Sequence, residues 1–309
     1  MNILLTGGAG YIGSLLATEL VNKGYKITVV DRIDFNDGSL NHLFYSKNFE
    51  FFRKDLLKVR FNEIKIKKFD LIIPLAALVG APLCKKKPVE AKKINQLWIE
   101  ELLLNLKKNQ KIIYPTTNSG YGIGERNKFC DETSPLKPIS LYGRTKVASE
   151  NAILSHKNSI SFRLATIFGS SYRMRTDLMV NNFTLRALND GKLEIFEPHF
   201  RRNFIHIRDV VSAFLFSIEN FNKMKGQIFN LGLSNANITK LELAKKIQKY
   251  LPYVKIKKTL NKRDPDQRDY FVSNKKIENI GFKAKISLDK GIQELIKLYK
   301  VNTNFKNNY

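Results

Sequence analysis

Short aliphatic runs alternate with amphipathic patterns along the first half of the chain. The runs occupy residues 2–6, 26–31, 49–53, 69–75, 111–115 and 160–164. Strands that alternate with helices in this way are typical of a parallel sheet covered by helices on both faces. We expect the first helix to stop at Gly24, because glycine adopts the left-handed conformation that ends many helices. The pattern predicts the α/β class, with a doubly wound parallel sheet of the Rossmann type.

Beyond residue 166 the strands and helices no longer alternate regularly, which predicts a smaller second lobe. This part begins with a polar loop at 170–177, followed by a helix after Asp209 and a strand at 227–231. Thr239 and Glu242 then form the capping box of another helix. We expect residues 1–166 to form the Rossmann domain, with 202–232 returning to it. Residues 167–201 and 233–300 form the smaller C-terminal lobe, and 301–309 form a frayed tail.

The segment from residue 89 to residue 106 is apolar at more positions than one sheet-facing stripe requires. These positions are Ile94, Leu97, Trp98, Ile99, Leu102, Leu103, Leu104 and Leu106. One interpretation is an unusually apolar surface helix. The other, which we favour, is a helix buried against both the sheet and a second subunit, so that the protein is a homodimer.

Composition narrows the class of protein. The 309 residues are 43% hydrophobic, which is enough for a sizeable core. The apolar start of the chain is too short for a signal peptide, and no stretch approaches the roughly 20 apolar residues of a membrane span. We therefore expect a cytoplasmic protein without membrane contact. Cys84 and Cys130 have no paired spacing, so neither a disulfide nor a structural zinc site is expected.

The formal net charge is +25, which raises the question of nucleic-acid binding. The lysines are scattered in pairs and triplets, as at 85–87 and 257–258, and no nucleic-acid-binding module accompanies them. We therefore expect no nucleic-acid partner. A basic protein would still attract a small substrate that carries a diphosphate.

The first chemical motif is TGGAGYIG, which follows the first strand and opens the first helix. Gly7, Gly10 and Gly13 occupy the positions where a tight turn, a close pyrophosphate approach and close helix packing exclude a side chain. Asp31 ends the second strand, where a carboxylate accepts hydrogen bonds from the adenosine ribose and repels a 2′-phosphate. The sequence therefore predicts NAD rather than NADP, although Arg32 beside Asp31 could offset part of that repulsion.

The second motif is SLYGRTK, in which Tyr142 and Lys146 stand four residues apart on a predicted helix. This spacing places both side chains on one helix face. A nearby ammonium group lowers the pKa of a phenol, so Tyr142 is a candidate proton acceptor for a hydride transfer, with Lys146 also holding the nicotinamide ribose. The strand at 111–115 runs into TTNSGYG and delivers Thr117 to the carboxyl end of the sheet, where open parallel sheets bind ligands.

These segments, in this order, resemble the extended short-chain dehydrogenase family, the NAD-dependent epimerases and dehydratases of nucleotide sugars. The resemblance covers nearly the whole chain. It implies that Thr117 hydrogen-bonds the sugar hydroxyl, that Tyr142 is the base and that Lys146 is its partner. It also implies a dimer, an NAD site in the larger domain and a nucleotide-sugar site in the smaller lobe.

The resemblance extends to the residues around both ligands. The residues expected to contact NAD are Gly7, Gly10, Tyr11, Ile12, Gly13, Asp31, Arg32, Asp55, Leu56, Leu75, Ala76, Ala77, Tyr142 and Lys146. Those expected to contact the sugar nucleotide are Val79, Asn118, Ser119, Thr166, Arg175, Asn181, Arg202 and Arg268. Of these, Arg202 in RRNFIHIRDVV and Arg268 in DPDQRDYFVS match the diphosphate-binding arginines.

One departure from the family concerns dehydration. The sugar 4,6-dehydratases of this family carry an Asp–Glu pair directly after the catalytic threonine. Here Asn118 and Ser119 stand in those places, so the acid and base that expel water are missing.

A closer resemblance is carried by IIPLAALVGAPLC, YPTTNSGYGIGE, FRLATIFG with RMRTDLMVNNFT, and EPHFRRNFIHIRDVV. These segments are similar to the GDP-heptose 4-oxidases of bacterial capsule heptose synthesis. Many relatives have Asn in the place of Thr166, so the local substrate contacts belong to this subgroup. Arg175 and Asn181 are expected, from their motif positions, to contact phosphate or sugar.

Three functions follow from this pattern. The first is net oxidation at C4 of a GDP-heptose, and the second is 4-epimerisation of a nucleotide sugar, which uses the same catalytic residues. The third is a nucleotide-sensing or scaffold protein, which the retained Thr117, Tyr142 and Lys146 disfavour. His206 is expected to be a buried structural histidine rather than a base. Asn95 is expected either to lie near the cofactor or to serve helix packing.

Overall fold

The computed structural model describes residues 1–34, 38–125, 128–259, 268–302 and 305. Its strands are β1 Asn2–Thr6, β2 Lys26–Asp31, β3 Phe49–Arg53, β4 Leu71–Pro74, β5 Lys111–Thr117, β6 Phe129–Cys130, β7 Ser159–Leu164, β8 Thr166–Phe168, β9 Lys192–Phe196, β10 Arg201–His206, β11 Gln227–Leu231, β12 Asn237–Thr239, β13 Lys255–Thr259 and β14 Phe271–Val272. Its helices are α1 Tyr11–Asn22, α2 Ala81–Lys86, α3 Pro88–Lys92, α4 Trp98–Asn105, α5 Leu141–Leu154, α6 Met179–Asp190, α7 Ile207–Glu219, α8 Phe221–Met224, α9 Lys240–Tyr250, α10 Lys275–Asn279 and α11 Leu288–Val301.

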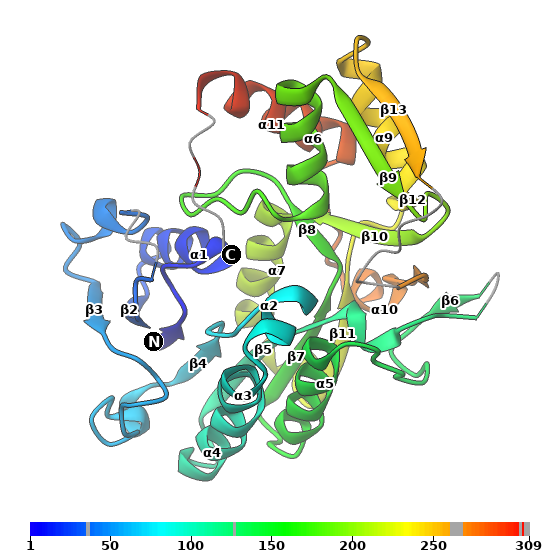
Figure 1. The fold of residues 1–309 in the computed structure, drawn as a ribbon. Coiled ribbons are helices and arrows are strands. Elements are labelled where there is room, and N and C mark those ends of the chain that lie inside the picture. Colours follow the sequence, from blue (N-terminus) through cyan, green and yellow to red (C-terminus); the bar gives the residue numbers. More distant parts are fainter. Residues whose placement is uncertain (35–37, 126–127, 260–267, 303–304, 306–309) are drawn as a thin grey trace.

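A large parallel sheet forms the centre of the molecule (Figure 1). Its order within the described residues is β11-β7-β5-β4-β1-β2-β3, and every neighbouring pair is parallel. β2 and β3 lie on one side of β1, and β4 lies on its other side, so the strand order reverses at β1. Such a reversal separates the loops that follow the two strands and opens a crevice at their carboxyl ends. The crevice therefore lies after β1 and β4.

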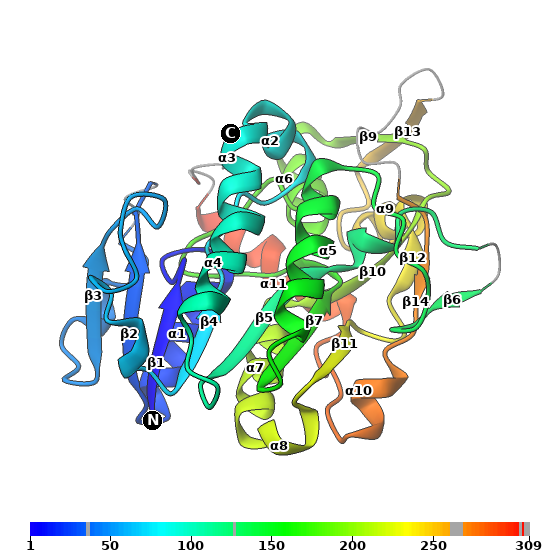
Figure 2. The same ribbon diagram turned by 90° about the horizontal axis from the view of Figure 1, so that it is seen from below.

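Alternating residues of the strands pack on opposite faces of the sheet. Ile3 and Leu5 of β1 belong to a core that includes side chains of α1 and α7. Leu4 between them belongs to a second core with Trp98 of α4 and Ile153 of α5. Figure 2 shows α3, α4 and α5 together on one face of the sheet. Burial on both faces explains why these strands are aliphatic at successive positions instead of alternating with polar residues.

A smaller lobe stands on the carboxyl side of the sheet. It contains α6, α9 and α11, together with the pair β9–β13 and a sheet in the order β12-β10-β8. The segment 202–232 was predicted to return to the large domain. Its first strand, β10, instead pairs with β8 and β12 in the smaller lobe. The segment packs on the large domain from α7 onward and joins the large sheet only with β11. The predicted tail lies mostly outside the described residues, since 303–304 and 306–309 are not described.

The predicted long strands agree closely with the structure, and the capping box of Thr239 and Glu242 is present. The predicted helix at 89–106 is interrupted: a π-helical turn at Lys93–Leu97 separates α3 from α4. In the described part of the chain, no helix is both long and apolar enough to cross a membrane.

Candidate active site

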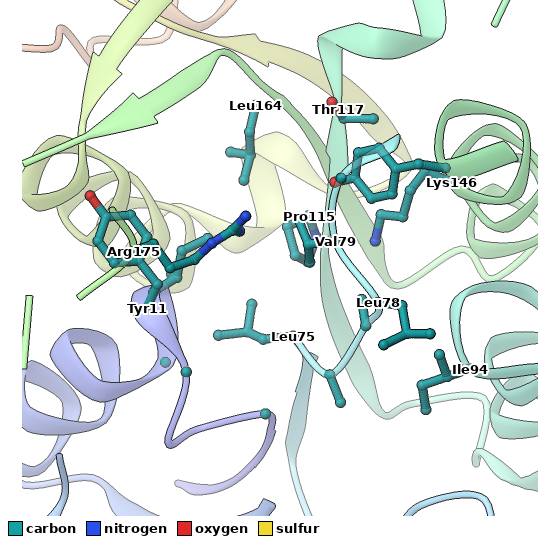
Figure 3. A pocket seen from close by; sticks show the side chains of 18 of the residues that line it. Tyr11, Leu75, Leu78, Val79, Ile94, Pro115, Thr117, Lys146, Leu164 and Arg175 are labelled. Carbon is teal, nitrogen blue, oxygen red and sulfur yellow. The ribbon is translucent and has the colours of Figure 1, made fainter. Parts of the chain in front are cut away.

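A cleft with a cavity volume of about 350 Å³ lies at the carboxyl ends of β1, β4 and β5. It extends from Asp31 at one end to Thr117 and Arg268 at the other. Figure 3 shows Arg175 reaching from the side of Tyr11 toward Pro115, with Thr117 and Lys146 across the cavity. Large apolar surfaces with a few convergent polar groups are typical of cofactor sites.

The turn between β1 and α1 is shaped for the close approach of a ligand. Gly7 has a φ of +70°, and a Cβ on Gly13 would lie 2.4 Å from the Gly7 carbonyl oxygen. Neither position therefore accepts a side chain without a shift of the backbone. Gly10 caps α1 without a side-chain hydrogen bond, so the first N–H groups of this helix face the cavity. Such N–H groups, with the helix dipole, bind phosphate groups.

Asp31 and Arg32 form the opposite end of the cavity. The Asp31 carboxylate accepts the backbone N–H groups of Ala9 at 3.0 Å and Ile33 at 2.9 Å. Burial raises the pKa of Asp31 above its usual value, while these two hydrogen bonds act in the opposite direction. Arg32 lies near three carboxylates, at 2.6 Å from Asp34, 3.0 Å from Glu90 and 3.9 Å from Asp55.

These carboxylates bear on whether Arg32 could attract the 2′-phosphate of NADP. Three carboxylates lie within 4 Å of the guanidinium group and Asp31 adds a fourth negative charge, so the local charge at this end is negative. A 2′-phosphate would meet repulsion, whereas two ribose hydroxyls can donate to Asp31. The phosphate-binding turn and this acidic end fit NAD.

The loop after β4 forms another wall of the cavity and is held in place by Asn95. The Asn95 side chain accepts the Leu78 N–H at 2.8 Å and donates to the Leu78 carbonyl oxygen at 2.8 Å. Asn95 is 1% exposed and stands in the π-helical turn. Ile94 lines the cavity and Asn95 does not, so Asn95 supports the cofactor wall from behind.

Thr117 and Tyr142 are brought together at the other end, from β5 and the first turn of α5. Ser140 caps α5 by accepting the Gly143 N–H, which sets the start of the helix just before Tyr142. Both residues line the cavity, and hydrogen bonding by Thr117 is one of the influences that lower the pKa of Tyr142. Burial raises the pKa of Tyr142 to about 12, and the charges of Arg175 and Arg268 act to lower it.

Lys146 is placed differently from the prediction. Its Nζ donates to Tyr114 Oη at 2.7 Å and lies 4.0 Å from the centre of that ring. Burial lowers the pKa of Lys146 to about 7, with Glu150 acting in the opposite direction. The cations named as acting on the pKa of Tyr142 are Arg175 and Arg268, so an effect of Lys146 on that pKa stays a prediction. Sequence reasoning also missed Tyr114, whose place inside a buried strand resembles that of any core residue.

All the residues predicted to contact NAD line the cavity, as do Val79, Ser119, Thr166, Arg175 and Arg268 from the predicted substrate set. Three predicted substrate residues do not line it: Asn118, Asn181 and Arg202. Asn118 is 1% exposed and is the first residue of the short, buried helical turn Asn118–Tyr121 that follows β5. An additional arginine, Arg173, lines the cavity and was not predicted, although it stands in the same polar loop as Arg175.

Asn181 and Arg202 support the cationic residues instead of lining the cavity. Asn181 accepts the Gly169 N–H at 3.0 Å and donates to the Arg175 carbonyl oxygen at 2.8 Å. Arg202 is 1% exposed and donates to the carbonyl oxygen of Arg268. Both side chains therefore hold segments that carry an arginine of the cavity.

His206 is a buried structural residue, as predicted. It is fully buried, and its Nε2 lies 2.6 Å from Glu294 of α11. Its other ring nitrogen accepts the Arg208 N–H at the start of α7. It does not line the cavity, so it has no role as a base there.

Comparison with known proteins agrees with this geometry. Residues 3–232 match the NAD dependent epimerase/dehydratase family. The chain is 27% identical over 362 residues to dTDP-D-glucose 4,6-dehydratase of Dictyostelium discoideum, with 98% of this chain and 82% of that protein covered. It is 28% identical over 332 residues to CDP-paratose 2-epimerase of Salmonella typhi, with 96% and 98% covered.

The fold is similar to that of a solved structure of UDP-glucuronic acid 4-epimerase from Bacillus cereus in complex with UDP-glucuronic acid and NAD. The TM-score is 0.85 at 23% identity, and the comparison covers 97% of this chain and 99% of that chain. The family match spans well over half of the sequence, and the residues of the cavity fit NAD. The chain belongs to the NAD-dependent epimerase/dehydratase family of enzymes.

Proposed function

We propose that the protein oxidises C4 of a nucleotide-linked sugar. The observation that carries this proposal is the meeting of Thr117 and Tyr142 at the end of β5, across the cavity from Arg175. A hydroxyl and a phenol at this place can bind one sugar hydroxyl and remove its proton. The arginines beside them suit the diphosphate of the substrate.

The chemistry divides between the protein and its cofactor. Bound NAD⁺ would supply the hydride acceptor for C4 and a positively charged nicotinamide ring. Tyr142 accepts the proton of the C4 hydroxyl, and Thr117 orients that hydroxyl. Lys146, which turns toward Tyr114 here, holds the nicotinamide ribose in the proposed mechanism. The C4–H and O–H bonds break together with formation of the ketone.

The carboxylates of the cavity favour oxidation over dehydration. Among the described residues that line it, the carboxylates are Asp31, Asp34, Asp55 and Glu90, all at the adenosine end. The elimination of water from a sugar needs an acid and a base near C5 and C6. The places next to Thr117 hold Asn118 and Ser119, which cannot supply them. The 4-keto product therefore keeps its C6 oxygen.

We infer that the substrate is GDP-D-glycero-α-D-manno-heptose, converted to its 4-keto form in capsular polysaccharide synthesis. Support comes from the segments similar to GDP-heptose 4-oxidases, which include Val79, Thr166 and Arg175 of the cavity. The alternative is a nucleotide-sugar 4-epimerase of the UDP-glucose type, in which the hydride returns to the opposite face of the ketone. Net oxidation, in contrast, leaves the cofactor reduced and requires a second oxidant, for which a small 2-oxo acid is a candidate.

Isotope transfer distinguishes these two reactions. The purified protein with NAD would be given GDP-heptose deuterated at C4, with UDP-glucose and dTDP-glucose carrying the same label in parallel. We expect the label of the GDP-heptose to move to the nicotinamide, with the absorbance of reduced cofactor appearing, and to leave when a 2-oxo acid is added. Return of the label to C4 of an inverted sugar, without net reduction of NAD, would establish the epimerase instead. Preferential turnover of a UDP or dTDP sugar would refute the GDP assignment.

A further inference from the structure

A chain of hydrogen bonds connects Arg268 to the catalytic residues. Arg268 Nη1 donates to Ser119 Oγ. Ser119 Oγ lies 2.8 Å from Thr117 Oγ1, and the Ser119 backbone N–H donates to the same Thr117 oxygen at 3.1 Å. Thr117 and Tyr142 line the same cavity, and hydrogen bonding by Thr117 acts to lower the pKa of the Tyr142 hydroxyl. Ser119 is 3% exposed and Thr117 is 8% exposed, so little water competes for these bonds.

The donor-to-acceptor direction of these hydrogen bonds is determined once Tyr142 is ionised. A phenolate can only accept, so the hydroxyl hydrogen of Thr117 must point to Tyr142. Thr117 Oγ1 then bonds Ser119 Oγ as an acceptor, and Ser119 supplies the hydrogen. Ser119 Oγ in turn accepts from Arg268, whose guanidinium group has donors only. Every bond therefore points toward Tyr142 and begins at a positive charge.

We propose that Ser119 is a positioning residue that transmits the charge of Arg268 through Thr117 to Tyr142 and so stabilises the phenolate. Aligned hydrogen bonds polarise one another in a buried site, and bonds from a charged donor are the stronger kind. This inference rests on the proposed function only in that Tyr142 acts as the base. It gives Ser119 a role other than the substrate contact that the sequence predicted.

The surroundings of Tyr142 show why such a connection matters. Burial is the main influence on its pKa, and the Cys84 side chain of α2 also acts to raise it. Tyr114 of β5 faces it and takes the hydrogen bond of Lys146. Arg175 and Arg268 are the cations that act to lower the pKa of Tyr142. Of these two, Arg268 is bonded to Ser119 and thereby to Thr117.

The ionisation of Tyr142 can be measured without any substrate. The NAD-saturated protein is titrated upward in pH while tyrosinate absorbance is followed, and the same titration of the Tyr142→Phe variant is subtracted. The difference reports Tyr142 alone. We expect Ser119→Ala, compared with Ser119→Ala/Tyr142→Phe, to raise the midpoint by about one pH unit, which is roughly tenfold less phenolate at a given pH. Circular dichroism at each pH restricts the comparison to folded protein.

Two further variants separate transmission from packing. Thr116→Val removes a neighbouring buried hydroxyl that has no hydrogen-bond partner among the described residues, so we expect it to leave the midpoint unchanged. Arg268→Met should raise the midpoint, and adding Ser119→Ala to it should then have little further effect, because the chain is already broken. An unchanged midpoint in Ser119→Ala would overturn the proposal, as would additive effects of the Ser119 and Arg268 substitutions.

The pH profile of cofactor reduction gives a second reading of the same ionisation. The substrate is the nucleotide sugar that the unmodified protein oxidises. Ser119→Ala should move the rise of the single-turnover rate to higher pH, while the steady-state KM for the sugar changes little. Should no nucleotide sugar reduce NAD, the proposed function fails. The substrate-free titration would still decide the role of Ser119, so the two failures are distinguishable.

Discussion

At the scale of single residues, Asp31 has a structural role, and we propose that it also recognises the cofactor. Its carboxylate accepts two backbone N–H groups, from Ala9 in the glycine turn and from Ile33 after β2. The same group is the part of the cavity that is suited to the ribose hydroxyls of NAD. The position of this aspartate at the end of the second strand was predictable from the sequence, whereas its two backbone contacts were not. They depend on how the glycine turn folds back over β2.

Replacing Asp31 with alanine should therefore affect both roles. We expect Asp31→Ala to weaken NAD binding by roughly 10- to 100-fold, which corresponds to the loss of a hydrogen bond to a charged group. The ratio of the affinity for NAD to that for NADP should also become smaller. Calorimetric titration with both cofactors measures this. Asp70→Ala is the control, because Asp70 also accepts a backbone N–H, from Asn2, but lies outside the cavity. If the ratio of the two affinities stays the same in Asp31→Ala, another residue distinguishes the cofactors.

Near Thr117 and Tyr142, the sequence predicted which residues meet but not all of their contacts. The motif spacing indicated Thr117, Tyr142 and Lys146 correctly as residues of one cavity. It could not show that Lys146 turns to Tyr114, because the contact joins α5 to a strand about thirty residues earlier. The burial of Asn118 was not predictable either, because it depends on side chains from other parts of the chain.

At the scale of elements, long strands were predictable and short ones were not. β1 and β2 have the predicted bounds, because runs of buried aliphatic residues are characteristic of strands inside a parallel sheet. β8 and β12 have three residues each, too few for any periodicity, and they depend on pairing with β10. The π-helical turn at Lys93–Leu97 also lacks a local pattern, since the apolar residues around it continue the helix.

This π-helical turn offers a prediction about how an element supports the cavity. Asn95→Ala removes both hydrogen bonds to Leu78 and leaves its buried N–H and carbonyl groups without those partners. We expect a loss of about 2 kcal/mol in the free energy of unfolding and weaker NAD binding, because the loop after β4 becomes less ordered. Urea unfolding and cofactor titration measure the two effects.

The matched control for this substitution is Asn105→Ala at the end of α4. Its side chain donates only to the Glu101 carbonyl oxygen of its own helix, at an exposed site. It should change the unfolding free energy by less than about 0.5 kcal/mol and leave NAD affinity unchanged. Equal effects of the two substitutions would show that Asn95 has no special link to the cofactor wall.

At the scale of the whole molecule, contacts between distant segments bring the arginine loop to the cofactor turn. Tyr11 at the start of α1 donates to the Gly169 carbonyl oxygen at 2.7 Å, and Ser171 donates to the Tyr11 carbonyl oxygen at 2.7 Å. Glu294 of α11 accepts Ser170 and His206 on the other side of the loop. The loop that carries Arg173 and Arg175 is thus held by both lobes, an arrangement that no local sequence pattern could reveal.

The apolar residues of α3 and α4 lead to a prediction about assembly. Val89 is 67% exposed, Leu97 43% and Leu104 86%, although each is a large apolar side chain. They follow one another at intervals of about two helical turns. α4 packs beside α5 on the outside of the sheet (Figure 2). Exposed apolar residues on such a face are typical of a subunit contact, which is consistent with the homodimer predicted from the sequence.

Leu104→Glu should disrupt that dimer. Burying a leucine contributes about 1.5–3 kcal/mol, and a symmetric contact contains this side chain twice, so a buried charge there should weaken association by at least roughly 100-fold. Light scattering over a range of micromolar concentrations would show a dimer for the unmodified protein and a monomer for Leu104→Glu. Tyr253→Glu provides the control, because Tyr253 is 58% exposed in the other lobe, after α9. A dimer that survives Leu104→Glu, or a monomeric unmodified protein, would show that this helix face has another role.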